Sequence, residues 1–250
     1  MKEHIKKNFS RAAKNYDNLA YPQEASARKL VWLASDIIKE NMQILDLGSG
    51  TSFIAKGICR NFATKNLQIF EVDIAPTMLA AWKQRPQNVS AICCDMENLP
   101  FEKNKFDVIF SSFALHWLKD FEKNFAQFSS MLKKNGYFAF CLPTYGSLDE
   151  LRAGEVFEFH NFPEISTIKS SLENCGAKEI YFECNSIPQE FPDALSAVKF
   201  IKKIGGNSSN SKKIIKRNDL AKFNNFCLKN SRSDKSFIIS WNISYFIYQI

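Results

Sequence analysis

The stretch Gln43-Ile44-Leu45-Asp46-Leu47-Gly48-Ser49-Gly50-Thr51-Ser52-Phe53-Ile54-Ala55 decides the fold of this chain. An apolar run that contains one carboxylate leads into two glycines that are one residue apart. This pattern is typical of a buried parallel strand that turns tightly into a helix. In nucleotide-binding sheets this first turn lies at the carboxyl ends of the strands, where ligands bind. The stretch therefore predicts a ligand-binding turn directly after Leu47.

Strand and helix patterns alternate along the rest of the chain. Helical spacing of apolar residues covers 1–40 in two segments that Pro22 separates. Further strands are expected at 67–73, 89–93, 106–110, 136–142, 179–184 and 237–245, and further helices at 53–62, 76–82, 121–132, 147–157, 163–172, 193–204 and 219–228. This alternation predicts an α/β fold with an open, doubly wound, mostly parallel sheet and helices on both faces.

Composition and charge restrict the class of protein. With 250 residues, 45% hydrophobic and 24% charged, the chain suits one globular domain with a substantial core. The net charge of +7 favours acidic partners, but the lysines are scattered, so nucleic acid is not an expected partner. Seven cysteines without repeated spacing indicate reduced thiols. We find neither a signal peptide nor an apolar run of about 20 residues, so we expect a soluble, cytoplasmic protein that does not act on membranes.

Acidic and polar residues follow the predicted strands. Asp73 lies 23 residues after Gly50, close to the spacing at which a carboxylate accepts hydrogen bonds from ribose hydroxyls. Asp95-Met96, after the third strand, can contact an adenine edge. Ser111-Ser112, after the fourth strand, would line the remaining side of the crevice. Because these strand ends meet at one edge of the sheet, they predict a single nucleoside site.

The first turn separates two candidate cofactors. A dinucleotide site needs a third glycine three residues after the second, and Phe53 stands there instead. Asp46, two residues before Gly48, would repel a phosphate but suits the ammonium group of an amino acid. S-adenosyl-L-methionine carries an ammonium group, a ribose and an adenine. It therefore suits this turn better than NAD.

These residues resemble the class I S-adenosylmethionine-dependent methyltransferases. The resemblance lies in Leu45-Asp46-Leu47-Gly48-Ser49-Gly50-Thr51, Val72-Asp73-Ile74-Ala75-Pro76-Thr77-Met78, Cys94-Asp95-Met96-Glu97-Asn98-Leu99-Pro100-Phe101 and Phe106-Asp107-Val108-Ile109. Ser52 departs from the family pattern, which usually has a third glycine there. The resemblance implies a Rossmann-like sheet of seven strands with an antiparallel last strand, and cofactor contacts from Asp46, Gly48, Ser49, Gly50, Asp73, Ile74, Asp95, Met96 and Ser111.

A second set of motifs lies in the flanks of the core. It comprises Phe9-Ser10-Arg11-Ala12-Ala13-Lys14-Asn15-Tyr16-Asp17 with Ala20 and Gln23, Ala114-Leu115-His116-Trp117, Gly146-Ser147-Leu148-Asp149-Glu150-Leu151, and Phe191-Pro192-Asp193-Ala194-Leu195-Ser196-Ala197 with Ile204-Gly205. These segments resemble the malonyl-acyl-carrier-protein O-methyltransferases of biotin synthesis. This resemblance implies methyl transfer to the free carboxylate of malonyl-acyl carrier protein, and a malonyl methyl ester that primes pimeloyl and biotin synthesis.

The same resemblance implies how the single methyltransferase domain, 1–250, is organised. Residues 1–40 would form a helical lid, residues 43–142 the cofactor-binding core, and residues 190–230 a helical insertion over the active site. The alternating strand 237–245 would close the sheet. The carrier protein is the expected partner.

Four residues are candidates for the catalytic site. A carboxylate with a pKa near 4 is already ionised at neutral pH, so no general base is required. Tyr16, His116 and Trp117 are expected to form an aromatic lid that excludes water, and Lys202 to hold the malonyl carboxylate. Tyr16 and Trp117 could equally be core residues, and His116 a structural histidine. We expect no metal site, because the pair Cys93-Cys94 has no partner pair at ligand spacing.

Several alternatives remain open on sequence alone. The chain could methylate a free small acid, as trans-aconitate methyltransferases do, or another small metabolite. It could also be a non-catalytic module that binds the cofactor. The basic segment 212–217 is either a solvated surface or a docking patch for the acidic carrier protein.

Overall fold

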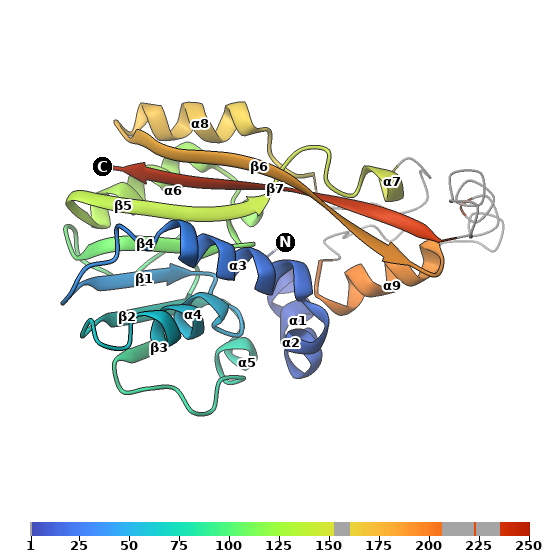
Figure 1. Cartoon of the computed structure of the whole chain (residues 1–250), viewed down its shortest axis with the longest axis horizontal. Helices are drawn as coiled ribbons and strands as arrows, with labels where there is room; N and C mark the ends of the chain where they lie inside the picture. The colour runs from blue at the N-terminus through green and yellow to red at the C-terminus, as the bar shows by residue number, and fades with distance from the viewer. Residues whose placement is uncertain (1, 153–160, 207–222, 224–235) are drawn as a thin grey trace.

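A single mixed sheet forms the centre of the computed structural model, which describes residues 2–152, 161–206, 223 and 236–250 (Figure 1). Within these residues seven strands lie in the order β3-β2-β1-β4-β5-β7-β6. Their bounds are Gln43–Leu47 for β1, Gln68–Asp73 for β2, Val89–Cys93 for β3, Phe106–Ser112 for β4, Leu132–Pro143 for β5, Lys178–Phe191 for β6 and Phe237–Gln249 for β7. β1 to β5 pair in parallel, and β7 runs antiparallel to both β5 and β6. The predicted sheet, including its antiparallel last strand, is confirmed.

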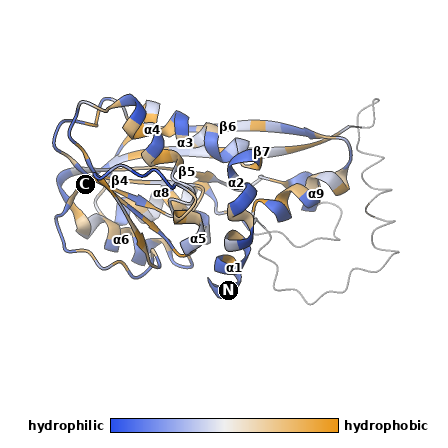
Figure 2. Ribbon diagram, turned by 90° about the horizontal axis from the view of Figure 1, so that it is seen from below, coloured by the Kyte–Doolittle hydropathy of each residue, from blue (hydrophilic) through white to orange (hydrophobic). Residues whose placement is uncertain are grey.

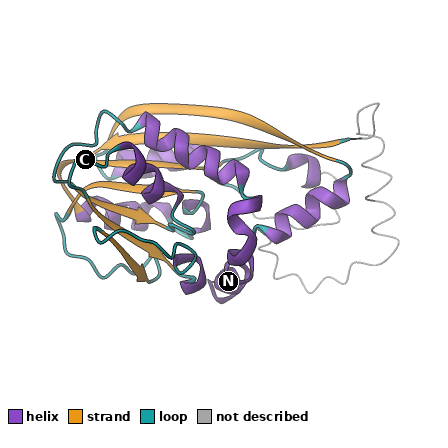
Figure 3. Cartoon of the chain, turned by 60° about the horizontal axis from the view of Figure 1, so that its bottom comes forward, coloured by secondary structure: helices purple, strands orange, loops and turns teal. Residues whose placement is uncertain are grey.

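The helices are Lys2–Ala12 (α1), Ala13–Asn15 (η1), Tyr16–Leu19 (α2), Tyr21–Leu33 (α3), Phe53–Asn61 (α4), Pro76–Leu79 (α5), Leu115–Trp117 (η2), Phe121–Met131 (α6), Asp149–Arg152 (α7), Ile165–Asn174 (α8) and Ala194–Lys203 (α9). Figure 3 shows them on both sides of the sheet. None of the helices in the described ranges is long and apolar enough to cross a membrane.

Successive residues of the central strands pack into two different cores. In β1, Ile44 joins the core under α3 and α4, whereas Leu45 and Leu47 join the core under α6 and α8. Both faces of the strand are therefore buried, which explains why its sequence is apolar apart from Gln43 and Asp46. The central strands are largely orange in Figure 2. The second core is rich in phenylalanine, with ring centroids 4.6 Å apart for Phe138 and Phe140 and 4.8 Å apart for Phe140 and Phe246. Phe140 and Phe246 are stacked, whereas Phe138 and Phe140 are tilted, and these contacts account for part of the high phenylalanine content.

The strand β6 is longer than its sequence pattern indicates. The prediction ended at Cys184, but pairing with β7 continues to Phe191, which lies opposite Phe237. β6 is the edge strand of the sheet, and an edge strand tolerates Pro188 because one side of its backbone has no ladder partner. Figure 1 shows β6 and β7 extending past the carboxyl ends of the parallel strands to reach α9.

The order of the strands reverses between β1 and β4, and α1 and α2 lie across the carboxyl ends at this point (Figure 1). A reversal of this kind opens a crevice in which ligands bind. β4 continues to Ser112, so Ser111 and Ser112 belong to the strand itself rather than following it. The predicted helix 219–228 and the basic segment 212–217 lie outside the described residues, apart from Phe223.

The tight turn after β1 generates a test of stability. Gly48 has φ +65°, and a Cβ built on it would lie 2.3 Å from the Cβ of Ala114. Gly176 has a similar φ of +73° but no atom within 4 Å of such a Cβ, so Gly176→Ala is a matched control. We expect Gly48→Ala to lower the free energy of unfolding by about 3 kcal/mol, from strain plus the clash, and Gly176→Ala by about 1 kcal/mol from strain alone. Denaturant unfolding measures both, and equal losses would contradict the close packing at Gly48.

Candidate active site

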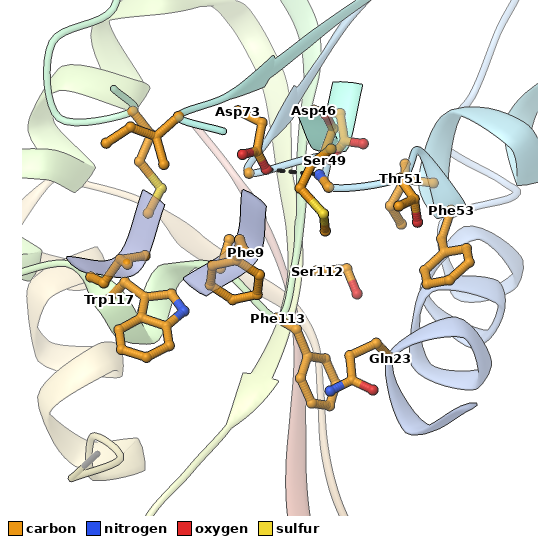
Figure 4. A pocket seen from close by; sticks show the side chains of 18 of the residues that line it. Phe9, Gln23, Asp46, Ser49, Thr51, Phe53, Asp73, Ser112, Phe113 and Trp117 are labelled. Carbon is orange, nitrogen blue, oxygen red and sulfur yellow. Dashed lines mark hydrogen bonds between the residues drawn. The ribbon is translucent and has the colours of Figure 1, made fainter. Parts of the chain in front are cut away.

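A pocket of about 870 Å³, including its open mouth, lies at the strand reversal. The first turn, the ends of β2, β3 and β4, and α1 to α3 all contribute to its wall (Figure 4). The structure brings most of the predicted cofactor residues together there: Asp46, Gly48, Ser49, Gly50, Asp73, Ile74, Asp95 and Met96. Tyr16 and Trp117 line the same pocket.

Ser111 is the predicted cofactor residue that does not line this pocket. Its buried hydroxyl donates a hydrogen bond of 2.8 Å to the carbonyl oxygen of Leu47, its register partner on β1. Ser111 therefore ties β4 to β1. The next residue, Ser112, points its side chain the other way and lines the pocket (Figure 4).

Asp46 is a buried acid without a partner. Its side chain is fully buried, and neither carboxylate oxygen has a hydrogen-bond partner among the described residues. The same holds for Ser49 Oγ, Thr51 Oγ1 and Gln23 Oε1, which line the same pocket. Burial raises the pKa of Asp46 well above its usual range, and the nearby Glu71 and Asp73 raise it further. Buried polar groups are normally hydrogen-bonded, so these atoms indicate the binding site of a ligand that carries a cationic donor group.

Asp73 fixes the turn to the second strand. Its two oxygens accept hydrogen bonds from the backbone N–H of Gly50 at 2.9 Å and of Ala75 at 2.8 Å. Figure 4 shows Asp73 beside the turn. Burial raises the pKa of Asp73 to about 6, and the two backbone hydrogen bonds oppose this rise. Each carboxylate oxygen keeps a second lone pair for a further donor. Because Gly50 donates its N–H to Asp73, this amide is not offered to a phosphate.

A partly buried ion pair supports the acidic turn from behind. Glu71 lies beside Asp46 in the parallel register and is fully buried. Arg85 Nε donates to Glu71 Oε2 at 2.8 Å, and Arg85 Nη2 donates to the carbonyl of Leu79 at 2.7 Å and to Ser52 Oγ at 3.4 Å. Ser52, which stands where a third glycine is usual, adopts a left-handed φ of +75°. Arg85 compensates Glu71, so the uncompensated negative charge faces the pocket. No sequence pattern indicated Arg85.

The first helix closes over the other end of the pocket. Lys2 Nζ donates to Asp95 Oδ2 at 2.6 Å and also contacts the carboxylate of Glu97. Asp95 Oδ1 accepts the backbone N–H of Glu97 at 3.0 Å. The predicted adenine-binding acid is thus joined to α1, and this ion pair links the predicted lid to the end of β3.

An aromatic wall separates the pocket from a second, apolar chamber of about 420 Å³. Phe9, Tyr16, Phe113 and Trp117 line both cavities. The Phe9 ring lies 6.3 Å from Tyr16 and 6.1 Å from Trp117 between centroids. Burial raises the pKa of Tyr16 above its ordinary value, so Tyr16 stays a neutral phenol. The chamber therefore begins where the cofactor pocket ends.

The chamber is uncharged along its described walls. Among the described residues that line it there is no Lys, Arg, Asp or Glu; its polar groups are Tyr16, Gln23, His116 and the indoles. The predicted residue His116 lies in this chamber, with its ring 5.5 Å from that of Phe162 and 4.9 Å from that of Trp117. Three of the four predicted catalytic residues thus share one site.

Lys202 is the fourth, and the structure does not bring it to this site. Its exposed side chain lines a different cleft, on the outer side of the N-terminal helices, together with Arg11 and Lys203. Sequence reasoning also missed Gln23, Thr51 and Phe113 as site residues. Gln23 belongs to the flanking signature and carried a usable signal, whereas nothing in the local sequence indicated that Phe113 would adopt φ +54°.

Comparisons with known proteins agree with this geometry. A family model described as "Methyltransferase domain" matches residues 45–140. "Malonyl-[acyl-carrier protein] O-methyltransferase 1" of Ilyobacter polytropus is 30% identical over 85% of this chain and 81% of its own length. "Malonyl-[acyl-carrier protein] O-methyltransferase" of Halorhodospira halophila is 24% identical over 82% of this chain and 72% of its own.

Solved structures show the same fold. A putative methyltransferase from Bacillus halodurans superposes with a TM-score of 0.66 and 14% identity, over 90% of this chain and 98% of its own. A putative sarcosine dimethylglycine methyltransferase from Galdieria sulphuraria gives 0.59 and 20%, over 90% and 86%. Sequence similarity over most of both chains and an acidic turn at the strand reversal lead to one assignment. The chain belongs to the malonyl-[acyl-carrier protein] O-methyltransferase family of the class I S-adenosylmethionine-dependent methyltransferases.

Proposed function

We propose that the protein methylates the free carboxylate of a malonyl group carried as a thioester on acyl carrier protein. The product would be the malonyl methyl ester that primes biotin synthesis. The names of the relatives support this substrate. The observation that carries it is the chamber behind the acidic pocket, whose described walls contain no Lys, Arg, Asp or Glu. In the reaction an S–CH3 bond breaks, an O–CH3 bond forms, and S-adenosylhomocysteine is released.

The residues of the acidic pocket suit S-adenosylmethionine. Asp46 would accept hydrogen bonds from the ammonium group, with Gln23, Ser49 and Thr51 around the same amino-acid moiety. The second lone pairs of Asp73 would receive the ribose hydroxyls. Asp95, Met96 and Ile74 would surround the adenine, with Gly48 and Gly50 allowing close approach of the backbone. When bound, this cofactor supplies an electrophilic methyl group on a positively charged sulfur.

The chamber suits a nucleophile that is already ionised. A carboxylate with an ordinary pKa near 4 needs no base. Because the described walls carry no lysine or arginine, they would not hold the carboxylate in a tight ion pair that lowers its reactivity. Tyr16 and His116 can orient it through hydrogen bonds. The negative charge of the carboxylate and the positive charge of the sulfonium neutralise each other during methyl transfer. Walls that exclude water therefore stabilise the neutralised transition state relative to the two separate ions.

The N-terminal helices and α9 would enclose the reaction. We assign residues 1–40 as the lid, because Phe9 and Tyr16 form part of both cavities and Lys2 joins α1 to Asp95. Residues 43–142 would hold the cofactor. In the predicted insertion 190–230, Ile201 and Ile204 line the chamber.

The cofactor assignment predicts that replacing Asp46 weakens cofactor binding without lowering stability. We expect Asp46→Asn to weaken binding of S-adenosylhomocysteine about 10- to 100-fold, because a charge-assisted hydrogen bond is lost. The free energy of unfolding should not fall, since a buried unpaired charge is removed. Calorimetry and denaturant unfolding measure the two quantities. Asp107→Asn is the control, because Asp107 binds Gln43 N and Lys133 Nζ away from the pocket. Asp107→Asn should lower the free energy of unfolding and leave the affinity for S-adenosylhomocysteine unchanged. If Asp46→Asn instead lowers stability and leaves this affinity unchanged, Asp46 is not part of the cofactor site.

The raised pKa of Asp73 predicts how affinity depends on pH. The pKa is about 6 in the folded protein against an ordinary 3.8, so Asp73 is protonated below about pH 6 and accepts fewer hydrogen bonds from ribose. The affinity for S-adenosylhomocysteine should therefore rise as pH increases through 6, with at most about a tenfold change per pH unit for one proton. Titration calorimetry between pH 5 and 8 measures the slope. In Asp73→Asn the slope of affinity against pH should fall to the part that protonation of Asp46 contributes. An unchanged slope would contradict the role of Asp73.

Transfer of a labelled methyl group tests the substrate. We expect transfer to malonyl-acyl carrier protein and, less efficiently, to malonyl-CoA, and almost none to free malonate or trans-aconitate. Tyr16→Phe should lower turnover about tenfold, the cost of one hydrogen bond, without changing cofactor affinity. Equal rates on free acids would favour a small-acid methyltransferase. Cofactor binding without transfer to any malonyl thioester would instead indicate a non-catalytic module.

A further inference from the structure

A third cavity lies on the outer side of the N-terminal helices, between α1–α2 and α9. Its volume is about 1130 Å³, including its mouth, which is open to solvent. Figures 1 and 3 show α9 beside these helices, beyond the carboxyl ends of the parallel strands. Its lining residues are Asn8, Arg11, Ala12, Asn15, Asn18, Leu19, Lys202 and Lys203. We call this cavity the outer cleft.

The outer cleft has the donor set of an anion site. Arg11, Lys202 and Lys203 supply three cations, and the remaining polar residues are three asparagines. Among the described residues that line it there is no Asp or Glu. Asn8 and Arg11 from α1, Asn15 from η1 and Asn18 from α2 all line this cleft. Arginine and lysine beside amide donors form charge-assisted hydrogen bonds with phosphate oxygens.

The outer cleft and the apolar chamber lie on two sides of the same helical wall. Phe9 and Tyr16 face the chamber, whereas Arg11 and Asn15 from the same segment face the cleft. On α9, Ile201 faces the chamber while Lys202 and Lys203 face the cleft. The two segments pack closely where they meet, because a Cβ on Gly205 would lie 2.9 Å from Phe9 Cδ1.

We propose that the outer cleft binds the phosphodiester of the pantetheine arm that carries the acyl group. This inference rests on the proposed function, because a malonyl thioester of a carrier protein or of coenzyme A has its acyl group at one end of a flexible arm and a phosphodiester at the other. Judged by the described residues that line them, the cofactor pocket is acidic, the chamber carries no Lys, Arg, Asp or Glu, and the outer cleft is basic. Lys202 would therefore hold the phosphate rather than the malonyl carboxylate.

Substrates with and without the phosphate test this assignment. We would measure kcat/KM for malonyl-4′-phosphopantetheine and malonyl-pantetheine with the wild type and the double variant Arg11→Gln/Lys203→Gln. The matched control is Lys14→Gln/Lys199→Gln, which removes two exposed charges from the same segments outside the cleft. Removing the phosphate should lower kcat/KM about tenfold in the wild type and the control, and less than about twofold in the cleft variant.

Three outcomes would overturn the proposal. The first is that removing the phosphate has no effect in the wild type. The second is that the cleft variant keeps the full effect of the phosphate, and the third is that this variant loses activity equally on both substrates. If the cleft variant loses activity only with malonyl-acyl carrier protein, the cleft contacts the acidic surface of the carrier protein and not the phosphodiester. Parallel assays with malonyl-CoA show whether the phosphodiester of coenzyme A uses the same cleft.

A binding measurement separates this proposal from the proposed function. With S-adenosylhomocysteine present, calorimetry should show 4′-phosphopantetheine binding about tenfold more tightly than pantetheine, and the cleft variant should abolish this difference. If the wild type methylates no malonyl thioester but keeps this difference, the function fails and the phosphate site stands. If 4′-phosphopantetheine and pantetheine bind equally, the phosphate site fails whatever the activity.

Discussion

A buried carboxylate that has no partner among the described residues is the constraint on which the site depends. Asp46 is fully buried beside Glu71 and near Asp73, so three acids occupy the ends of two adjacent strands. Burying an uncompensated charge is costly, and the raised pKa of Asp46 expresses that cost. Arg85 compensates Glu71 from behind. The remaining negative charge faces the pocket, where a cationic ligand would relieve it.

The path of the backbone follows from the same acids. Gly48, Gly50 and Ser52 all have positive φ, so the chain reverses within five residues and begins α4 beside the strand ends. Asp73 takes the Gly50 amide that a phosphate would otherwise use. The turn is thereby closed to a dinucleotide and open to a nucleoside with an amino-acid moiety. The pattern of one acid and two glycines selects this type of ligand because Asp73 fixes the turn through its hydrogen bond to the Gly50 amide.

The N-terminal helices connect three cavities of different polarity. Lys2 contacts the acidic pocket, Phe9 and Tyr16 form the boundary of the uncharged chamber, and Arg11 faces the basic cleft. The N-terminal helices therefore border an acidic, an apolar and a basic cavity. This order matches the cationic cofactor and the acyl group with its anionic arm that we propose as the substrate. The charge of each cavity, rather than its size, distinguishes the ligands that it can take.

The sequence by itself determined the elements of the core and the class of cofactor, because strand periodicity, glycines at a turn and acids at strand ends are local patterns. It also placed Tyr16, His116 and Trp117 in one site through the flanking signatures. Only the tertiary structure decided that Ser112 and not Ser111 faces the pocket, that Arg85 supports the turn, and that Lys202 belongs to an outer cleft. These outcomes depend on which face of a helix or strand meets a segment far away in the chain. Such packing leaves no periodic trace in either segment.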